Sequence, residues 1–194
     1  MNVLKRLVRA AGIALLVVFL AGCPGKQTDE LTRLCQRLES AQAQERVDTA
    51  QLIGLQGPLA MPAAPQLIKM LKSANPDERA TAAQALGRVL IDPARHWRGT
   101  PRASEPDPFA DQRRAQQRQA VTALVPLIED KDDQVRSTAA VALSYLGCEA
   151  EPALRELERL AKHNQAARFA VNELKRLLAM ERARVAKSTT DVRP

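Results

Sequence analysis

The side chains best suited to catalysis or metal binding are few and scattered along this 194-residue chain. It has two histidines, His96 and His163, and three cysteines that are 12 and 113 residues apart, so it has no Cys-x-x-Cys metal or redox pair. It also lacks a His-Glu-x-x-His site, a Gly-x-Ser-x-Gly nucleophile motif and a Gly-Lys-Ser/Thr phosphate loop. We therefore expect no enzyme activity, no metal and no cofactor.

Cys23 is the cysteine with a recognisable chemical context. Met1–Arg9 is basic, and Ala10–Ala21 is an almost continuous apolar run that is shorter than the roughly 20 residues a transmembrane helix needs. A basic start, a short apolar run and small residues are typical of a secretory signal. An uncleaved anchor or a plain secretory signal would share these features.

The sequence Leu20-Ala21-Gly22-Cys23 resembles the lipobox of bacterial lipoproteins. That resemblance implies that residues 1–22 are a signal peptide, cleaved before Cys23, and that Cys23 carries lipid. Because Pro24 rather than Asp follows the cysteine, it also implies transfer to the outer membrane, facing the periplasm. Residues 23–29 would then be a short polar tether that keeps the body close to the membrane.

The other two cysteines are Cys35 and Cys148. Two cysteines in an oxidising compartment favour a disulfide. If the helices stack as described below, however, about two layers separate the two cysteines, and a Cα separation of about 20 Å exceeds the ~7 Å that a disulfide spans. We predict two unbridged, largely buried thiols.

The net charge of +7 lies at the two ends of the chain. Residues 1–22 contribute +3 and residues 168–194 contribute +4, while the stretch between them has 19 basic and 19 acidic residues. A nucleic-acid-binding domain would carry its positive charge on the folded body. We therefore expect no nucleic-acid partner and interpret residues 181–194 as a basic tail.

A short code recurs along the body of the chain. Its first copy is Arg46, Ala50, Ile53, Gly54. The second copy, shifted by 33 residues, is Arg79, Ala83, Leu86, Gly87, and the third, shifted by a further 57, is Arg136, Ala140, Leu143, Ser144. A fourth copy has Ala167, Val171 and Leu174 in register but no arginine. The spacing places each set on one face of a helix. We predict helices at about 28–43, 45–56, 62–73, 76–90, 110–129, 133–146, 150–162 and 165–186.

Local signals mark the ends of these helices. Asn75 precedes Pro76 and is a suitable N-cap, with Glu78 completing a capping box. Gly147 and its equivalent Gly57 lie where a helix end favours a residue that tolerates positive φ.

Residues 124–147 resemble a HEAT repeat. The resemblance rests on an Asp in the turn between two helices, Val-Arg at the start of the second helix, and the Ala and Leu residues that follow; the matching residues are Asp130, Val135, Arg136, Ala139, Ala140, Leu143 and Gly147. It implies an all-α fold, a short α-solenoid of about four HEAT-like helix pairs over residues 30–180. Asp130 and the recurring arginines are then expected to form a structural network. An ordinary Ala-rich helical bundle is the alternative.

The longer second spacing implies an insertion at about residues 91–115. It is rich in proline, which opposes regular helix, and it holds Trp97 in Arg95-His96-Trp97-Arg98. A loop that interrupts a repeat is often functional. It could also be a passive insertion in which Trp97 packs on the solenoid.

In HEAT arrays the second helices line the concave side. There the register predicts an outward strip, the docking strip; its members are Asp48, Gln51, Leu55, Thr81, Gln84, Arg88, Thr138, Val141, Tyr145, Phe169, Asn172 and Arg176. Aromatic and arginine side chains are typical of interface hot spots. We expect a protein or peptide to bind at Arg88, Tyr145, Phe169 and Arg176, with Trp97, unless the two rings pack into the core.

The sequence thus favours a lipid-anchored, periplasm-facing adaptor or scaffold without catalysis. One alternative is a ligand-binding protein or enzyme that uses the insertion around His96 and Trp97; a deep polar pocket containing His96 would favour it. A second is an envelope structural protein whose basic tail contacts anionic polymer.

Overall fold

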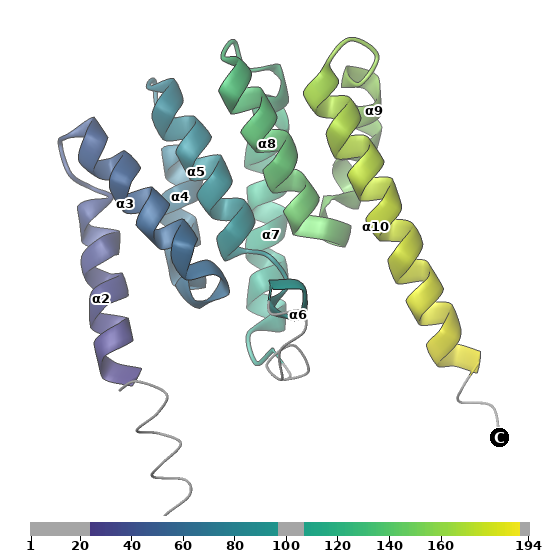
Figure 1. The fold of residues 1–194 in the computed structure, drawn as a ribbon, viewed down its shortest axis with the longest axis horizontal. Coiled ribbons are helices and arrows are strands. Elements are labelled where there is room, and N and C mark those ends of the chain that lie inside the picture. Colours follow the sequence, from purple (N-terminus) through teal and green to yellow (C-terminus); the bar gives the residue numbers. More distant parts are fainter. Residues whose placement is uncertain (1–23, 97–106, 191–194) are drawn as a thin grey trace, which may run out of the picture.

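The computed structural model describes residues 24–96 and 107–190, and every regular element in these ranges is a helix (Figure 1). The elements are α2 (Pro24–Arg37), α3 (Ala43–Gln56), the 3-10 helix η1 (Gly57–Ala63), α4 (Ala64–Met70), α5 (Pro76–Val89), α6 (Pro93–His96), α7 (Ala110–Leu124), the 3-10 helix η3 (Val125–Glu129), α8 (Asp133–Leu146), the 3-10 helix η4 (Gly147–Ala153), α9 (Leu154–Leu160) and α10 (Gln165–Thr190). Among these described helices none has the length and apolar character to cross a membrane.

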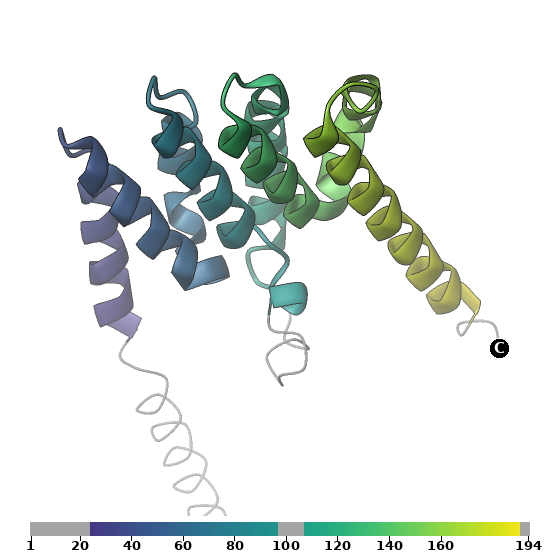
Figure 2. The same cartoon turned by 45° about the horizontal axis from the view of Figure 1, so that its top comes forward.

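The helices form four pairs that stack in chain order. Layer one is α2 with α3, layer two is η1–α4 with α5, layer three is α7–η3 with α8, and layer four is η4–α9 with α10. The second helices α3, α5, α8 and α10 lie side by side in one row, and the first helices lie behind them (Figures 1 and 2). The predicted all-α solenoid of about four helix pairs is confirmed.

The recurring apolar residues form the core between the two rows. In each of the first three layers the Ala and the Leu or Ile of the code are at most 1% exposed; these residues are Ala50, Ile53, Ala83, Leu86, Ala140 and Leu143. The code works because its members share one helical face, and that face is buried against the first helices and the neighbouring layers.

Two glycines start new layers. Gly57 ends α3 with φ 58° and Gly147 ends α8 with φ 63°, a region that a Cβ atom disfavours. Each is followed by a 3-10 turn that leads into the next first helix, so the prediction of a positive φ at Gly147 is confirmed. The link from α5 to layer three differs, because the insertion takes the place of this turn.

Three segments differ from the predicted boundaries. Helix α2 begins at Pro24, inside the segment expected to be the tether, and α10 continues to Thr190, inside the expected basic tail. Extending a formed helix costs little, and the Ala, Met, Glu, Arg and Lys residues after 178 are good helix formers. The insertion contains the short helix α6, whereas Trp97 lies outside the described residues.

Candidate docking groove

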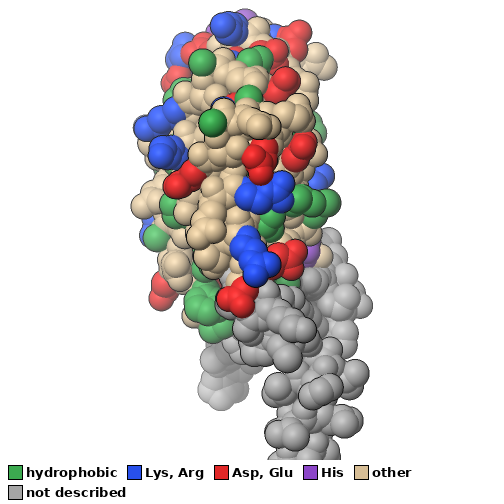
Figure 3. All heavy atoms as spheres, turned by 90° about the vertical axis from the view of Figure 1, so that its left-hand side faces the viewer, with side chains coloured by type: hydrophobic (Ala, Val, Ile, Leu, Met, Phe, Trp, Pro, Cys, Tyr) green, Lys and Arg blue, Asp and Glu red, His purple; other side chains and the backbone are tan. Residues whose placement is uncertain are grey.

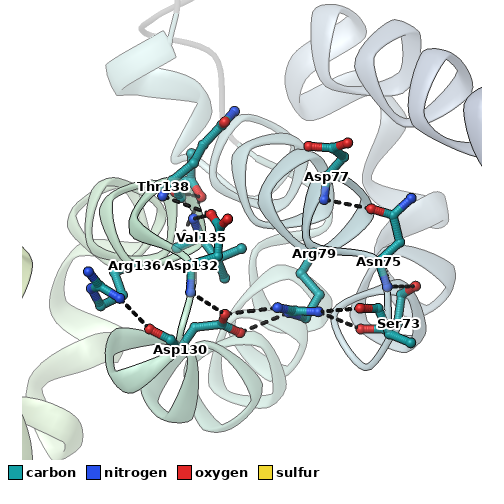
Figure 4. A network of polar contacts seen from close by, with 11 residues as sticks. Ser73, Asn75, Asp77, Arg79, Asp130, Asp132, Val135, Arg136 and Thr138 are labelled. Atoms are coloured by element: carbon teal, nitrogen blue, oxygen red, sulfur yellow. Dashed lines mark hydrogen bonds and ion pairs between the residues drawn. The ribbon is translucent and has the colours of Figure 1, made fainter.

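The start of each second helix carries a repeated polar network at one edge of the stack. Asn75 accepts the backbone N–H of Asp77 at 2.9 Å and so caps α5, as predicted, and Asp132 caps α8 by accepting the N–H groups of Gln134 and Val135 (Figure 4). Two residues before the cap, the side chain of Ser73 or Asp130 accepts the N–H of the cap residue. These bonds fix the turn in front of each helix.

The recurring arginine is four residues after the cap and closes this turn. Arg46 donates to the carbonyl oxygen of Ser40 at 2.5 Å, Arg79 to that of Ser73 at 2.9 Å, and Arg136 to that of Asp130 at 2.6 Å. The same bond occurs in three layers, which explains why the arginine recurs. The guanidinium supplies a hydrogen-bond donor to a turn carbonyl oxygen that no helical backbone N–H reaches.

Two of the arginines also join one layer to the next, and we call such an ion pair a rung. Arg46 of layer one binds Glu78 of layer two at 2.6 Å, and Arg79 binds both carboxylate oxygens of Asp130 of layer three at 2.8 Å (Figure 4). The Arg79 guanidinium holds the pKa of Asp130 below its usual value through these hydrogen bonds. Glu78 is therefore part of a rung and not of a capping box, which corrects the sequence prediction.

The third rung is missing in the described part of the chain. Arg136 pairs with Asp133 on its own helix, because layer four has no carboxylate where the other rungs have one: counted from the cap, Lys162 stands at the position of Asp130 and Ala167 at that of Glu78. Asn164 takes over the link: it caps α10 by accepting the N–H of Ala167, and it donates to the carbonyl oxygen of Ile128 at 2.6 Å.

The predicted fourth copy is confirmed by burial: Ala167 and Leu174 are fully buried and Val171 is 6% exposed. Arg168 is four residues after its cap residue, Asn164, and its backbone N–H bonds the Asn164 carbonyl oxygen as in the other layers. Its side chain is exposed, however, and makes no hydrogen bond or ion pair with the described residues, so it does not replace the arginine of the code.

The second helices also differ in how closely they approach. A Cβ atom on Gly54 would lie 3.1 Å from the Ala85 Cα, and one on Gly87 would lie 3.0 Å from the Ala142 Cα. Glycine thus allows near-backbone contact at the first two junctions. At the third junction the repeat places Ser144 in the glycine position.

A groove of about 950 Å³ opens between α8 and α10, where the rung is missing. Its lining comprises Glu129, Asp130, Asp133, Arg136, Ser137, Ala140, Val141, His163, Asn164, Gln165, Ala166 and Phe169. Phe169 is 46% exposed and Val141 36%, so the groove has apolar surface between a rim of carboxylates and Arg136.

A smaller hollow of about 150 Å³ adjoins the groove between α5 and α8. It is lined by Gln84, Arg88, Ser137, Thr138, Val141, Ala142 and Tyr145. The hollow and the groove share Ser137 and Val141, so the two form one continuous surface across three second helices.

The structure brings together three of the residues predicted to bind a partner. Arg88 and Tyr145 line the hollow, and Phe169 lines the groove next to it. Tyr145 is half-buried, because its ring lies over Gly87. Arg176 lies two turns beyond Phe169, pairs with Glu173 at 2.8 Å and lines neither space.

His96 lines neither the groove nor the hollow. Its ring lies over Gly57, where a Cβ atom would be 2.9 Å away. A site around His96 and Trp97 stays a prediction, since Trp97 lies outside the described residues; within these residues no cluster of metal-ligating side chains occurs.

The prediction for the cysteines is half right. Cys35 and Cys148 form no disulfide with each other. Cys35 is half-buried, and burial raises the pKa of its thiol. Cys148 is exposed, not buried, because it follows Gly147 on the outside of the 3-10 turn η4 instead of continuing the buried face of α8.

The polar rim of the groove was not predicted from the sequence. Glu129, Asp133 and His163, which line the groove, were assigned no part in binding. A difference between the copies could have indicated this rim. The third copy has a carboxylate, Asp133, one turn before its arginine, whereas the first two copies have Ala43 and Pro76 there.

Comparison with known proteins agrees with this geometry. Residues 105–146, which include α7, η3 and α8, match the family model described as HEAT-like repeat. No curated protein matches the chain. The chain is therefore an all-α solenoid whose third layer is similar to a HEAT-like repeat, a kind of helical repeat that commonly serves as a protein-interaction scaffold.

Proposed function

We propose that the protein is a lipid-anchored, periplasm-facing adaptor that holds a protein or peptide in the groove between α8 and α10. The observation that carries this proposal is the groove itself, an open space of about 950 Å³ between α8 and α10. At the α3–α5 and α5–α8 junctions, in contrast, glycine lets the second helices approach closely. A repeat protein binds its partners through such extended surfaces.

The lining of the groove fits an extended segment with one apolar side chain. Phe169 and Val141 offer exposed apolar surface that a partner would cover. Asp133, Arg136 and Glu129 at the rim can pair with backbone and polar groups on either side of that side chain. Arg88 and Tyr145 in the adjoining hollow extend the surface by one layer.

The anchor follows from the sequence alone. Leu20-Ala21-Gly22-Cys23 supports lipidation of Cys23, and the absence of Asp after the cysteine supports the outer membrane. Several acyl chains on one cysteine would hold the protein stably at a bilayer.

Affinity capture from membrane extracts tests the docking surface. We expect Phe169→Ala and the double variant Arg88→Ala/Tyr145→Ala to lose the partner that the native protein recovers. Arg155→Ala is the matched control, because Arg155 is exposed on α9 and lines neither space. Equal recovery with all four proteins would contradict the groove as the docking site.

Mass spectrometry of the purified protein tests the anchor separately. The native chain should begin at Cys23 and carry the mass of its acyl chains, and Cys23→Ser should abolish both the cleavage and the added mass. A native chain without added lipid would contradict the anchor and leave the groove proposal intact.

A further inference from the structure

Large apolar side chains are exposed at one edge of the stack. Leu55 is 70% exposed at the C-terminal end of α3, and Leu59 in η1 is 45% exposed. Phe109, directly before α7, is 56% exposed, and Met180, in the C-terminal half of α10, is 51% exposed. Each of these four side chains exposes apolar surface to water. The apolar side chains of the core, in contrast, are covered by neighbouring helices.

Three of these residues lie at helix ends that share one edge of the molecule. Leu55 is one residue before the end of α3, Leu59 follows it in η1, and Phe109 directly precedes α7. Met180 lies on the half of α10 that leads to the same edge. The C-terminal end of α3, the N-terminal end of α7 and the C-terminal end of α10 all point to the lower edge in two views (Figures 1 and 2). Figure 3 shows hydrophobic side chains gathered at the lower end of the side formed by layer one. The opposite edge carries the caps and the rungs and is polar (Figure 4).

The chain places its proposed anchor at this edge as well. Helix α2 begins at Pro24, directly after Cys23, and its first turn lies at the lower edge (Figure 1). The helix therefore starts one residue after the proposed lipid, with no long tether between them. A lipid at Cys23 would hold the apolar edge against the bilayer.

The charges near the edge suit an anionic surface. Helix α10 ends here, and its last ten residues contain three basic residues, Arg182, Arg184 and Lys187, against one acidic residue, Glu181. Arg113 neutralises Asp107, beside Phe109, at 2.9 Å. Basic segments of this kind are attracted to anionic headgroups.

We propose that this edge contacts the membrane, with Leu55 and Leu59 inserted at the level of the lipid headgroups. The proposal rests on the proposed lipid anchor for the orientation of the body, but the edge has its own affinity for lipid. Apolar side chains at an interface gain free energy in proportion to the area they bury, and nearby basic residues add to it. The row of second helices would then stand upright on the bilayer, with the groove open to the side.

Vesicle flotation with a chain that starts at Pro24 tests the edge without the anchor. This chain keeps every buried core residue, since these lie between Leu34 and Leu178. It should float with vesicles of phosphatidylethanolamine and phosphatidylglycerol, and Leu55→Gln/Leu59→Gln should lower the partition coefficient about tenfold. Phe169→Gln, which removes a ring that is about as exposed as Leu59 but lies near the N-terminal end of α10, should change the partition coefficient less than about twofold.

Three results would overturn the proposal. One is a native chain that does not float, and another is a double variant that floats like the native chain. The third is a native chain that sediments as a dimer, with the dimer lost in the double variant, because the edge would then bind a second copy. None of these results concerns lipidation, which the mass of the full-length protein reports independently.

Discussion

The α5–α8 junction and the α8–α10 junction are built from the same repeat and close to different degrees. At α5–α8, Gly87 lies against Ala142, and Arg79 reaches across to Asp130 in a pair whose side chains are 9% and 10% exposed. At α8–α10, Ser144 stands in the glycine position and Arg136 turns back to Asp133, which is 91% exposed. As a result, an open groove lies at the α8–α10 junction.

The difference teaches how a solenoid can open a groove without a new structural element. Layer four offers Arg136 no carboxylate, and the layers stay joined through Asn164. Arg136 then lines the groove and does not form a rung. Each prediction below changes one of these features.

Arg79→Leu should have the largest effect on stability. It leaves the Asp130 carboxylate buried without its partner, and breaking a buried pair in this way costs about 3–5 kcal/mol of the free energy of unfolding. Chemical denaturation followed by circular dichroism measures the loss. A loss below about 1 kcal/mol would mean that the rung does not hold layers two and three together.

Acid titration of the native protein checks the same pair. Because Arg79 lowers the folded pKa of Asp130 below its unfolded value of about 3.9, the pair contributes its stability above that pH. The contribution disappears as the pH falls through the lower folded pKa. In Arg79→Leu this part of the acid dependence should be missing.

Gly87→Ala should have the second largest effect. The new Cβ atom would lie 2.9 Å from the Tyr145 ring and 3.0 Å from the Ala142 Cα, so the two helices must separate. We expect a loss of about 1–3 kcal/mol, although alanine favours the helix itself. Ser144→Ala at the open junction is the comparison and should change the free energy of unfolding by less than about 1 kcal/mol.

Asn164→Ala should weaken the open junction. It removes the cap of α10 and the bond to the Ile128 carbonyl oxygen, at an expected cost of about 1–2 kcal/mol. Hydrogen exchange should then increase in the first turns of α10 and stay unchanged in α5. Equal changes in both helices would show that the layers unfold as one unit.

Arg136→Leu should have the smallest effect. Arg136 pairs with a carboxylate that is almost fully in water, so the expected loss is at most about 1 kcal/mol. A loss as large as that of Arg79→Leu would contradict the distinction between the two junctions.

The sequence predicted the fold because the fold is carried by a local, periodic code. Ala50, Ala83 and Ala140 recur at one spacing from an arginine, and burial of that face follows from helical geometry. The cap at Asn75, the positive φ at Gly147 and the structural role of Asp130 were predictable for the same reason: each depends on a few neighbouring residues.

The groove could not be predicted in this way. It depends on the lack of a layer-four carboxylate for Arg136, and the positions from which a carboxylate can reach the arginine are known only once the contacts between layers are known. Glu78 was misread because its partner, Arg46, is 32 residues away. The fourth copy was predicted correctly from its apolar residues, Ala167, Val171 and Leu174, because their burial again follows from one helical face.

A crosslinking scan of the three junctions tests the central claim most directly. A photoreactive residue would replace Gln51, Asp77 or Gln165 in turn, since these exposed positions lie on α3, α5 and α10 and Gln165 alone of the three lines the groove. After illumination of the full-length protein in its own cells, we predict one discrete crosslinked product that is strongest from Gln165. Crosslinking from Gln51 or Asp77 that equals or exceeds that from Gln165 would contradict the α8–α10 groove as the docking site.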